Sequence, residues 1–199
     1  DARCQAIQDS AFCERLVAQA KERGALISEE QVFYLGDGDR PNYVGGPGES
    51  LAAMAAGRGL HSSEVFLELS RSTNGKALFT LRFFNQNMGA LAEAISSDFC
   101  IPSLGDAGAH VSQIMDSGWA TFVLSHWHRD AGLFTLSEAV RRLTSMPAAM
   151  IGLKDRGRLA PGMRADINVV DLANLSERMP EIAHDFPNGA PRFIQKALG

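Results

Sequence analysis

Residues 77–110, ALFTLRFFNQNMGALAEAISSDFCIPSLGDAGAH, decide the fold. The run 77–84 is apolar and rich in phenylalanine, which predicts a strand buried on both faces. The NQNMG turn leads into a predicted helix near 90–97, and FCIPSLG at 99–105 predicts a second buried strand. A strand, a helix and a strand in this order predict a βαβ unit with two parallel strands.

The loop after the second predicted strand is the first candidate site. Asp106 and His110 stand four residues apart in it, in a glycine-rich turn. In parallel α/β architectures the active site lies in the loops that follow the C-terminal ends of the strands. A carboxylate there can bind a metal ion and take a proton from water. The alternative is a simple turn, in which Asp106 accepts hydrogen bonds from nearby backbone N–H groups.

Helices are predicted along much of the remaining chain. The spacing of apolar residues and the Gly and Pro signals predict helices at 9–25, 50–59, 62–75, 112–127 and 135–153. The expected N-terminal caps are Ser50, Ser62 or Ser63, and Thr135 or Ser137. A short strand is predicted at 31–35, followed by a long loop at 36–50 that is rich in glycine and proline.

The stretch GRLAPGMRADINVVDL, at 157–172, has a different pattern. Two short apolar runs flank Pro161 and Gly162, and 166–172 alternates like a strand. Proline and glycine in this order are typical of the two central positions of a type II turn. We therefore expect a turn between two short strands.

The composition is that of an ordinary globular chain. Of the 199 residues, 45% are hydrophobic and 21% are charged, and the net charge is −4, which gives no reason to expect nucleic acid or an anionic membrane as a partner. No apolar run approaches the roughly 20 residues that a membrane span needs. Three cysteines without a C-x-x-C pair indicate free thiols and favour a reducing, cytoplasmic location.

A second candidate site is the H-x-H pair of His126 and His128, in SHWHRD. On a strand, residues i and i+2 share a face, and two imidazoles could bind one zinc ion. This segment, however, is predicted to end a helix, where residues i and i+2 point about 200° apart. We therefore expect Trp127 to pack at the helix end, His126 and His128 to be its solvated neighbours, with His126 favouring the helix C-terminus, and His184 to be a hydrogen-bonding loop residue.

Ordered motifs along nearly the whole chain resemble one family, among them PNY at 41–43 and FFNQNMGAL at 83–91 in the first half. GDAGAH at 105–110, SHW at 125–127, LTSMPA at 143–148 and GRLAPGMRAD at 157–166 resemble successive motifs of the amidohydrolase superfamily, and most closely those of the N-acyl-D-amino-acid deacylases, the D-aminoacylase-like group. The first motif departs from the family pattern, since Gly105 stands for the usual serine and Ala107 for a glycine.

The resemblance implies a fold and a chemistry. The expected fold is α/β: residues 1–155 would form the C-terminal part of a (β/α)8 barrel, and residues 156–199 would add strands to a small β-sandwich. The implied enzyme is a zinc-dependent hydrolase that cleaves the amide bond of N-acyl-D-amino acids or related small amides. Asp106 would bind the metal and move the proton, and His110 would contact the substrate.

The family's other metal ligands have no counterpart in this sequence. The early H-x-H is absent, and His126 and His128 follow Asp106, which is the wrong order. A whole barrel takes about 250 residues. We therefore expect the C-terminal portion of a longer enzyme, inactive alone, which associates with its upstream portion or with itself. The alternative is a non-catalytic partial-barrel module that acts in binding or oligomerisation.

Overall fold

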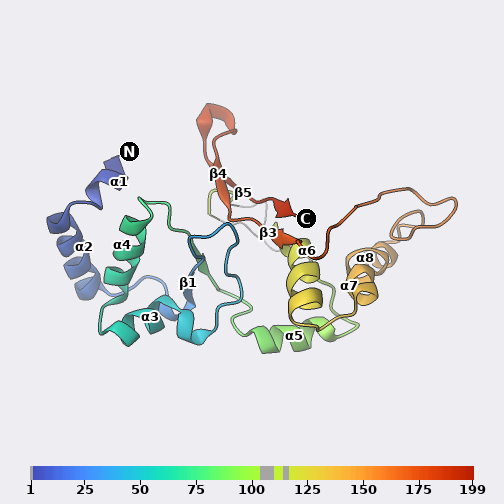
Figure 1. Cartoon of the computed structure of the whole chain (residues 1–199), viewed down its shortest axis with the longest axis horizontal. Coiled ribbons are helices and arrows are strands. Elements are labelled where there is room, and N and C mark those ends of the chain that lie inside the picture. The colour runs from blue at the N-terminus through green and yellow to red at the C-terminus, as the bar shows by residue number, and fades with distance from the viewer. Residues whose placement is uncertain (1, 104–109, 114–116) are drawn as a thin grey trace. The chain divides into compact units, whose positions relative to one another are not determined.

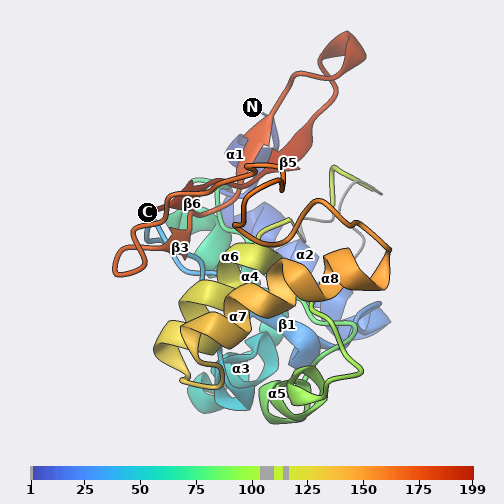
Figure 2. The ribbon, with the colours of Figure 1, turned by 90° about the vertical axis from the view of Figure 1, so that its right-hand side faces the viewer.

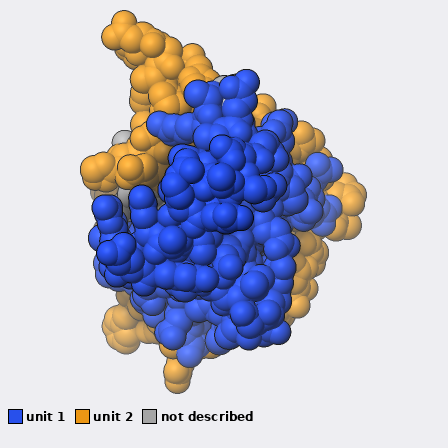
Figure 3. All heavy atoms as spheres, turned by 90° about the vertical axis from the view of Figure 1, so that its left-hand side faces the viewer, with its two compact units in different colours: residues 1–88 blue, residues 89–199 orange. Residues whose placement is uncertain are grey.

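The computed structural model describes residues 2–103, 110–113 and 117–199. The chain divides into two compact units, residues 1–88 and residues 89–199 (Figure 3). The sequence analysis predicts a different division, after residue 155, between part of a barrel and strands of a sandwich. That division stays a prediction. No helix in the described part of the chain is long and apolar enough to cross a membrane.

The first unit is built from helices and one short strand pair (Figure 1). Its helices are α1 (Ala2–Ala6), α2 (Ser10–Arg23), α3 (Leu51–Arg58) and α4 (Ser62–Ser72), with single 3-10 turns at η1 (Glu29–Gln31) and η2 (Pro47–Glu49). The buried core is formed by Leu51, Ala55 and Val65, against which Val32 and Phe79 pack. The first unit therefore joins α3 and α4 to the strand pair through one small apolar cluster.

Local signals set the helix ends in the first unit. The carboxylate of Asp9 accepts a hydrogen bond from the Ala11 N–H at 2.9 Å, and Gly24 ends α2 with a φ of 72°. Ser50 caps α3, as predicted, by accepting from the Ala53 N–H. The predicted cap of α4 was wrong by at least one residue, because His61 is the cap.

His61 replaces the serine cap because its backbone is extended and its ring nitrogen faces the helix. Nδ1 of His61 accepts from the Ser63 N–H at 3.3 Å, while the Glu64 carboxylate accepts from the His61 N–H at 2.7 Å. This reciprocal pair is a capping box. It places Ser62 inside the first turn of the helix.

The predicted parallel strand pair was wrong. The strand over 77–84 is reduced to β2 (Phe79–Leu81), which pairs antiparallel with β1 (Val32–Tyr34) in the register Phe33 to Thr80. Residues 100–103 form no strand. The apolar composition of both runs predicted burial, but a strand forms only where another strand satisfies its backbone groups, and Pro102 has no N–H to donate.

The helices of the second unit are α5 (Met88–Ser96), α6 (Trp119–Phe122), the π-helical η3 (Val123–Asp130), α7 (Leu136–Leu143) and α8 (Ser145–Met150). Helix η3 continues α6 and packs beside α7 (Figure 2). The helix predicted over 135–153 begins at the Thr135 cap but divides at Thr144. Pro147 explains the break, because it cannot donate to the carbonyl four residues earlier and is tolerated only in the first turn of a new helix.

The turn predicted in 157–172 is confirmed, and its flanking strands are not found. The Met163 N–H donates to the Ala160 carbonyl at 3.1 Å and Gly162 has a φ of 83°, as a type II turn requires. Residues 166–170 form no strand, and the side chains of Ile167 and Val169 are 60% and 95% exposed. No other described segment pairs with residues 166–170, so their backbone groups have no neighbouring strand with which to form a sheet.

Short antiparallel pairs complete the second unit. β3 (Ser176–Glu177) pairs with β6 (Ala197–Leu198), and β4 (Glu181–Ala183) pairs with β5 (Arg192–Ile194) around the turn η4 (Pro187–Gly189). The described chain therefore mixes helices with short strands, which agrees with the α/β class. The barrel and the sandwich stay predictions.

Candidate functional site

The predicted catalytic residue Asp106 lies outside the described residues. The predicted substrate contact His110 is described, and it is exposed with a left-handed φ of 47°. Its carbonyl accepts a hydrogen bond from the Gln113 N–H at 2.7 Å. The next residue, Val111, accepts from the Phe193 N–H at 2.9 Å, which ties this side of the loop to β5.

The segment that leads toward the loop is held by a buried arginine. Arg142, on α7, donates from Nη1 to the carbonyl oxygens of Ile95 at 2.6 Å, Ser97 at 2.9 Å and Cys100 at 3.0 Å. Its Nε binds the Glu138 carboxylate at 2.6 Å. The backbone on both sides of the candidate loop is therefore anchored to the second unit.

The H-x-H pair does not form a shared site. The ring of His126 stacks on Phe122 with centroids 4.7 Å apart, and burial lowers the pKa of His126 below its usual value. The ring of His128 instead contacts the Phe134 carbonyl through Nδ1 at 2.9 Å. The expected packing of Trp127 is confirmed, since it is 6% exposed, but both histidines are half-buried rather than solvated. The hydrogen bond expected of His184 is confirmed, since its Nδ1 lies 3.1 Å from the Gly189 carbonyl.

Glu177 is a buried carboxylate that the sequence did not single out. It lies on β3, and both its oxygens are 3.5 Å from the hydroxyl of Ser125 on η3. Burial raises the pKa of Glu177, an effect that the nearby Asp130 reinforces and Arg129 opposes. Glu177 is buried because β3 pairs with β6 and packs against α6. A sequence pattern does not reveal these contacts.

The residues that the structure describes do not fit the zinc ion that the resemblance implies. Among them, no three His, Cys, Asp or Glu side chains gather closely enough to hold a metal ion. A zinc site needs three or four such ligands.

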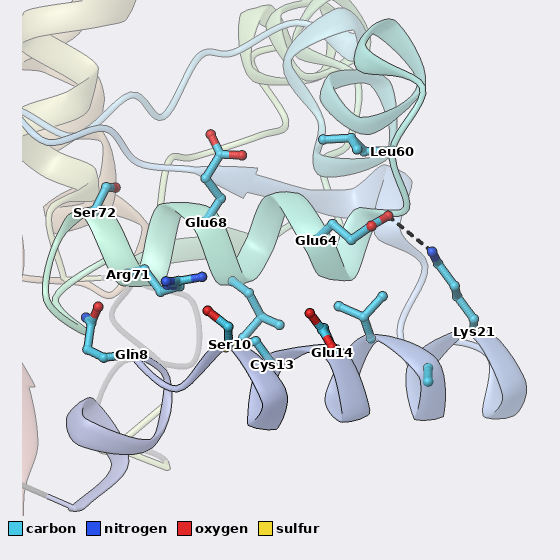
Figure 4. Close-up of a pocket in the computed structure, with 13 residues that line it drawn as sticks. Gln8, Ser10, Cys13, Glu14, Lys21, Leu60, Glu64, Glu68, Arg71 and Ser72 are labelled. Carbon is cyan, nitrogen blue, oxygen red and sulfur yellow. Dashed lines mark ion pairs between the residues drawn. The ribbon is translucent and has the colours of Figure 1, made fainter.

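A groove in the first unit runs between α2 and α4 (Figure 4). Val17 and Leu67 contribute apolar surface to it, and Lys21 and Glu64 bridge its two helices with an ion pair of 3.3 Å. None of the predicted site residues lines this groove. It offers no cluster of catalytic groups, and we assign it no chemistry.

Residues 94–186 match the amidohydrolase family. The chain is 40% identical over 91 residues to a D-aminoacylase of Alcaligenes xylosoxydans xylosoxydans, which covers 40% of this chain and 19% of the relative. It is 45% identical over 82 residues to an N-acyl-D-glutamate deacylase of the same organism, covering 40% of this chain and 16% of the relative.

A solved D-aminoacylase variant in complex with copper(II) chloride is 26% identical, with 73% of this chain and 29% of that chain covered and a TM-score of 0.37. A score of this size does not establish a shared fold. The chain spans less than a fifth of the length of the two curated relatives described above. The matched range nonetheless contains both predicted site residues, Asp106 and His110.

Proposed function

We propose that this chain, which matches the amidohydrolase family over residues 94–186 and is similar to two D-amino-acid deacylases, forms part of a hydrolase that cleaves the amide bond of N-acyl-D-amino acids. The resemblance predicted from the sequence motifs is confirmed by the family match and by the two deacylase relatives. That agreement carries the proposal. The whole protein's substrate, and its dependence on zinc, remain part of the proposal.

In this proposal Asp106 moves the proton. A water molecule attacks the amide carbonyl carbon, and Asp106 accepts the proton that the water loses. As the carbon–nitrogen bond breaks, Asp106 returns this proton to the nitrogen, which leaves as a free amine. The products are a carboxylic acid and a D-amino acid, and His110 contacts the substrate from the same loop.

The second candidate is a non-catalytic module that acts in binding or oligomerisation. Two observations favour it: the described residues gather no set of three metal ligands, and large apolar side chains are exposed, Phe99 and Val169 to more than 90%. Exposed apolar side chains of this size are typical of surfaces that associate with another chain when they cluster. A surface of this kind would suit self-association or association with an upstream portion of the enzyme.

Substrate hydrolysis separates the two candidates. The gene product that contains this chain is assayed with N-acetyl-D-amino acids, with their L-enantiomers as the matched control, and release of the free amino acid is measured. The proposal predicts release from the D-series, with acidic and apolar side chains compared to identify the preferred class. Association into oligomers without hydrolysis of either series would favour the non-catalytic module.

A further inference from the structure

Two asparagine–glycine pairs share one backbone conformation in different surroundings. Asn74 and Gly75 follow α4, and Asn188 and Gly189 lie in η4 at the tip of the β4–β5 hairpin (Figure 1). All four residues have a positive φ, 52° and 77° in the first pair and 63° and 68° in the second. A positive φ at both residues is the conformation of a type I′ turn, for which asparagine followed by glycine is preferred. The two pairs are therefore matched in sequence and in local conformation.

An asparagine that precedes a glycine can lose its side-chain amide without an enzyme. The backbone nitrogen of the glycine gives up its proton and attacks Cγ of the asparagine. A bond forms between this nitrogen and Cγ, the bond from Cγ to Nδ2 breaks, and ammonia leaves with the proton. Water then opens the resulting succinimide at either carbonyl, which gives aspartate or isoaspartate. Glycine favours the attack because it has no Cβ to restrict the backbone.

The nitrogen of Gly75 is held in a packed helix end. Its N–H donates to the Ser70 carbonyl in the last turn of α4, at 2.7 Å, and this hydrogen bond must open before the nitrogen can attack. The backbone here is closely packed, since a Cβ on Gly75 would lie 2.8 Å from the sulfur of Cys4. Helix α4 is itself anchored in the core by Val65, which is fully buried. Attack at Asn74 therefore requires the end of an anchored helix to fray.

The nitrogen of Gly189 is held only within the hairpin tip. Its N–H donates to the Phe186 carbonyl at 2.9 Å, three residues earlier in the same turn. Both Asn188 and Gly189 are exposed, and apart from the chain neighbours of Gly189 no described atom lies within 4 Å of the position that a Cβ there would take. The ring of His184 adds one contact, with Nδ1 3.1 Å from the Gly189 carbonyl oxygen. Loop tips open at a much lower free energy than packed helices.

We propose that Asn188 is a site of spontaneous deamidation in the folded protein, and that the end of α4 protects Asn74 from the same reaction. The inference is independent of the proposed function. The reaction places a new carboxylate at the hairpin tip, and its isoaspartate product lengthens the backbone of the turn by one carbon. Asn168 is an internal control, because it is also exposed but precedes the β-branched Val169.

Peptide mass spectrometry of the protein, aged in mildly alkaline buffer, measures the loss of each side-chain amide. We expect Asn188 to react about tenfold faster than Asn74, or more, because free energies of opening range from near zero at loop tips to the global value in packed elements. Asn168 should stay unreacted over the same period. In concentrated denaturant Asn74 and Asn188 should react at similar rates, because both precede glycine. Equal rates in the folded protein, or a difference that persists in denaturant, would overturn the proposal.

Amide hydrogen exchange gives the second readout, because exchange also requires the glycine N–H to leave its hydrogen bond. We expect Gly189 to exchange faster than Gly75 by a similar factor. The variant H184A should raise the exchange of Gly189 and the reaction of Asn188 by about twofold or more, since one hydrogen bond of the turn is lost, and should leave Asn74 unchanged. Rapid exchange at Gly189 with no reaction at Asn188, or a reaction that does not respond to H184A, would contradict the proposal.

Discussion

The carboxylate of Glu177 lies 3.5 Å from the hydroxyl of Ser125, and both side chains are buried. Burial raises the pKa of Glu177, so the folded protein holds its proton more tightly than the unfolded chain does. The resulting stabilisation is complete below the ordinary pKa of glutamate and is lost as the pH rises through the raised value. At neutral pH at least part of this stabilisation is therefore lost, because the carboxylate is ionised in the unfolded chain.

We expect E177Q to unfold at a higher temperature than the wild type at pH 7, and the difference to vanish below pH 4. Thermal unfolding between pH 3 and pH 8 measures this, with the exposed Glu181 as the control in E181Q. An E177Q variant that is less stable at pH 7 would show that the ionised carboxylate is needed by Arg129.

Glu138 should make stability depend on pH in the opposite direction to Glu177. Its hydrogen bonds with Arg141, and then with Arg142, lower the pKa of Glu138 to about 2. Its contribution to stability is present above the ordinary value of 4.5 and is lost as the pH falls toward 2. We expect E138Q to be less stable than the wild type at pH 6 and equal to it near pH 2, in the same thermal measurement. A destabilisation that persists unchanged at pH 2 would contradict an electrostatic cause.

Two glycines in the first unit should respond oppositely to alanine. Gly57 lies in α3 with open space around its Cα, so G57A should stabilise by about 0.5–1 kcal/mol. Gly75 has a φ of 77°, and a Cβ there would lie 2.8 Å from the sulfur of Cys4, so G75A should destabilise by at least about 1 kcal/mol. Denaturant unfolding of the two variants checks the signs, and a stable G75A would place Cys4 elsewhere.

The chain alone should not bind zinc tightly or hydrolyse N-acetyl-D-amino acids. Asp106 is one carboxylate where at least three ligands are needed, and the described residues offer no group of three. Calorimetric titration of the purified chain with zinc, followed by the hydrolysis assay, checks this. Stoichiometric binding together with hydrolysis would require His126 and His128 to be reconsidered as ligands.

Features that depend on a few neighbouring residues could be predicted from the sequence. The Ser50 and Thr135 caps and the type II turn at Pro161 and Gly162 all follow from side chains within four positions of the bonds they make. The pairing of β2 could not be predicted, since its partner β1 lies more than 40 residues away and an apolar run specifies burial but not a neighbour.

The candidate site, too, could be predicted from the sequence only in part. The motif around Asp106 and the resemblance it carries were visible in the sequence, and so was the unsuitable geometry of His126 and His128. The roles of Arg142 and Glu177 were not, because each depends on contacts more than 40 positions away that arise only when helices and strands come together. Charged residues inside a helix or a strand are exposed by default in a sequence-based interpretation.

Asp106 is proposed to transfer the proton during amide hydrolysis, and the decisive experiment measures kcat of D106N in the gene product. An asparagine keeps the size of the side chain but cannot accept a proton from water. We expect an unchanged thermal unfolding temperature and a kcat lower by about 10²–10⁴-fold, as is typical when a general base is removed. The exposed Asp171, changed to asparagine, serves as the control and should leave kcat unchanged. Near-wild-type turnover of D106N would show that Asp106 is only a turn residue.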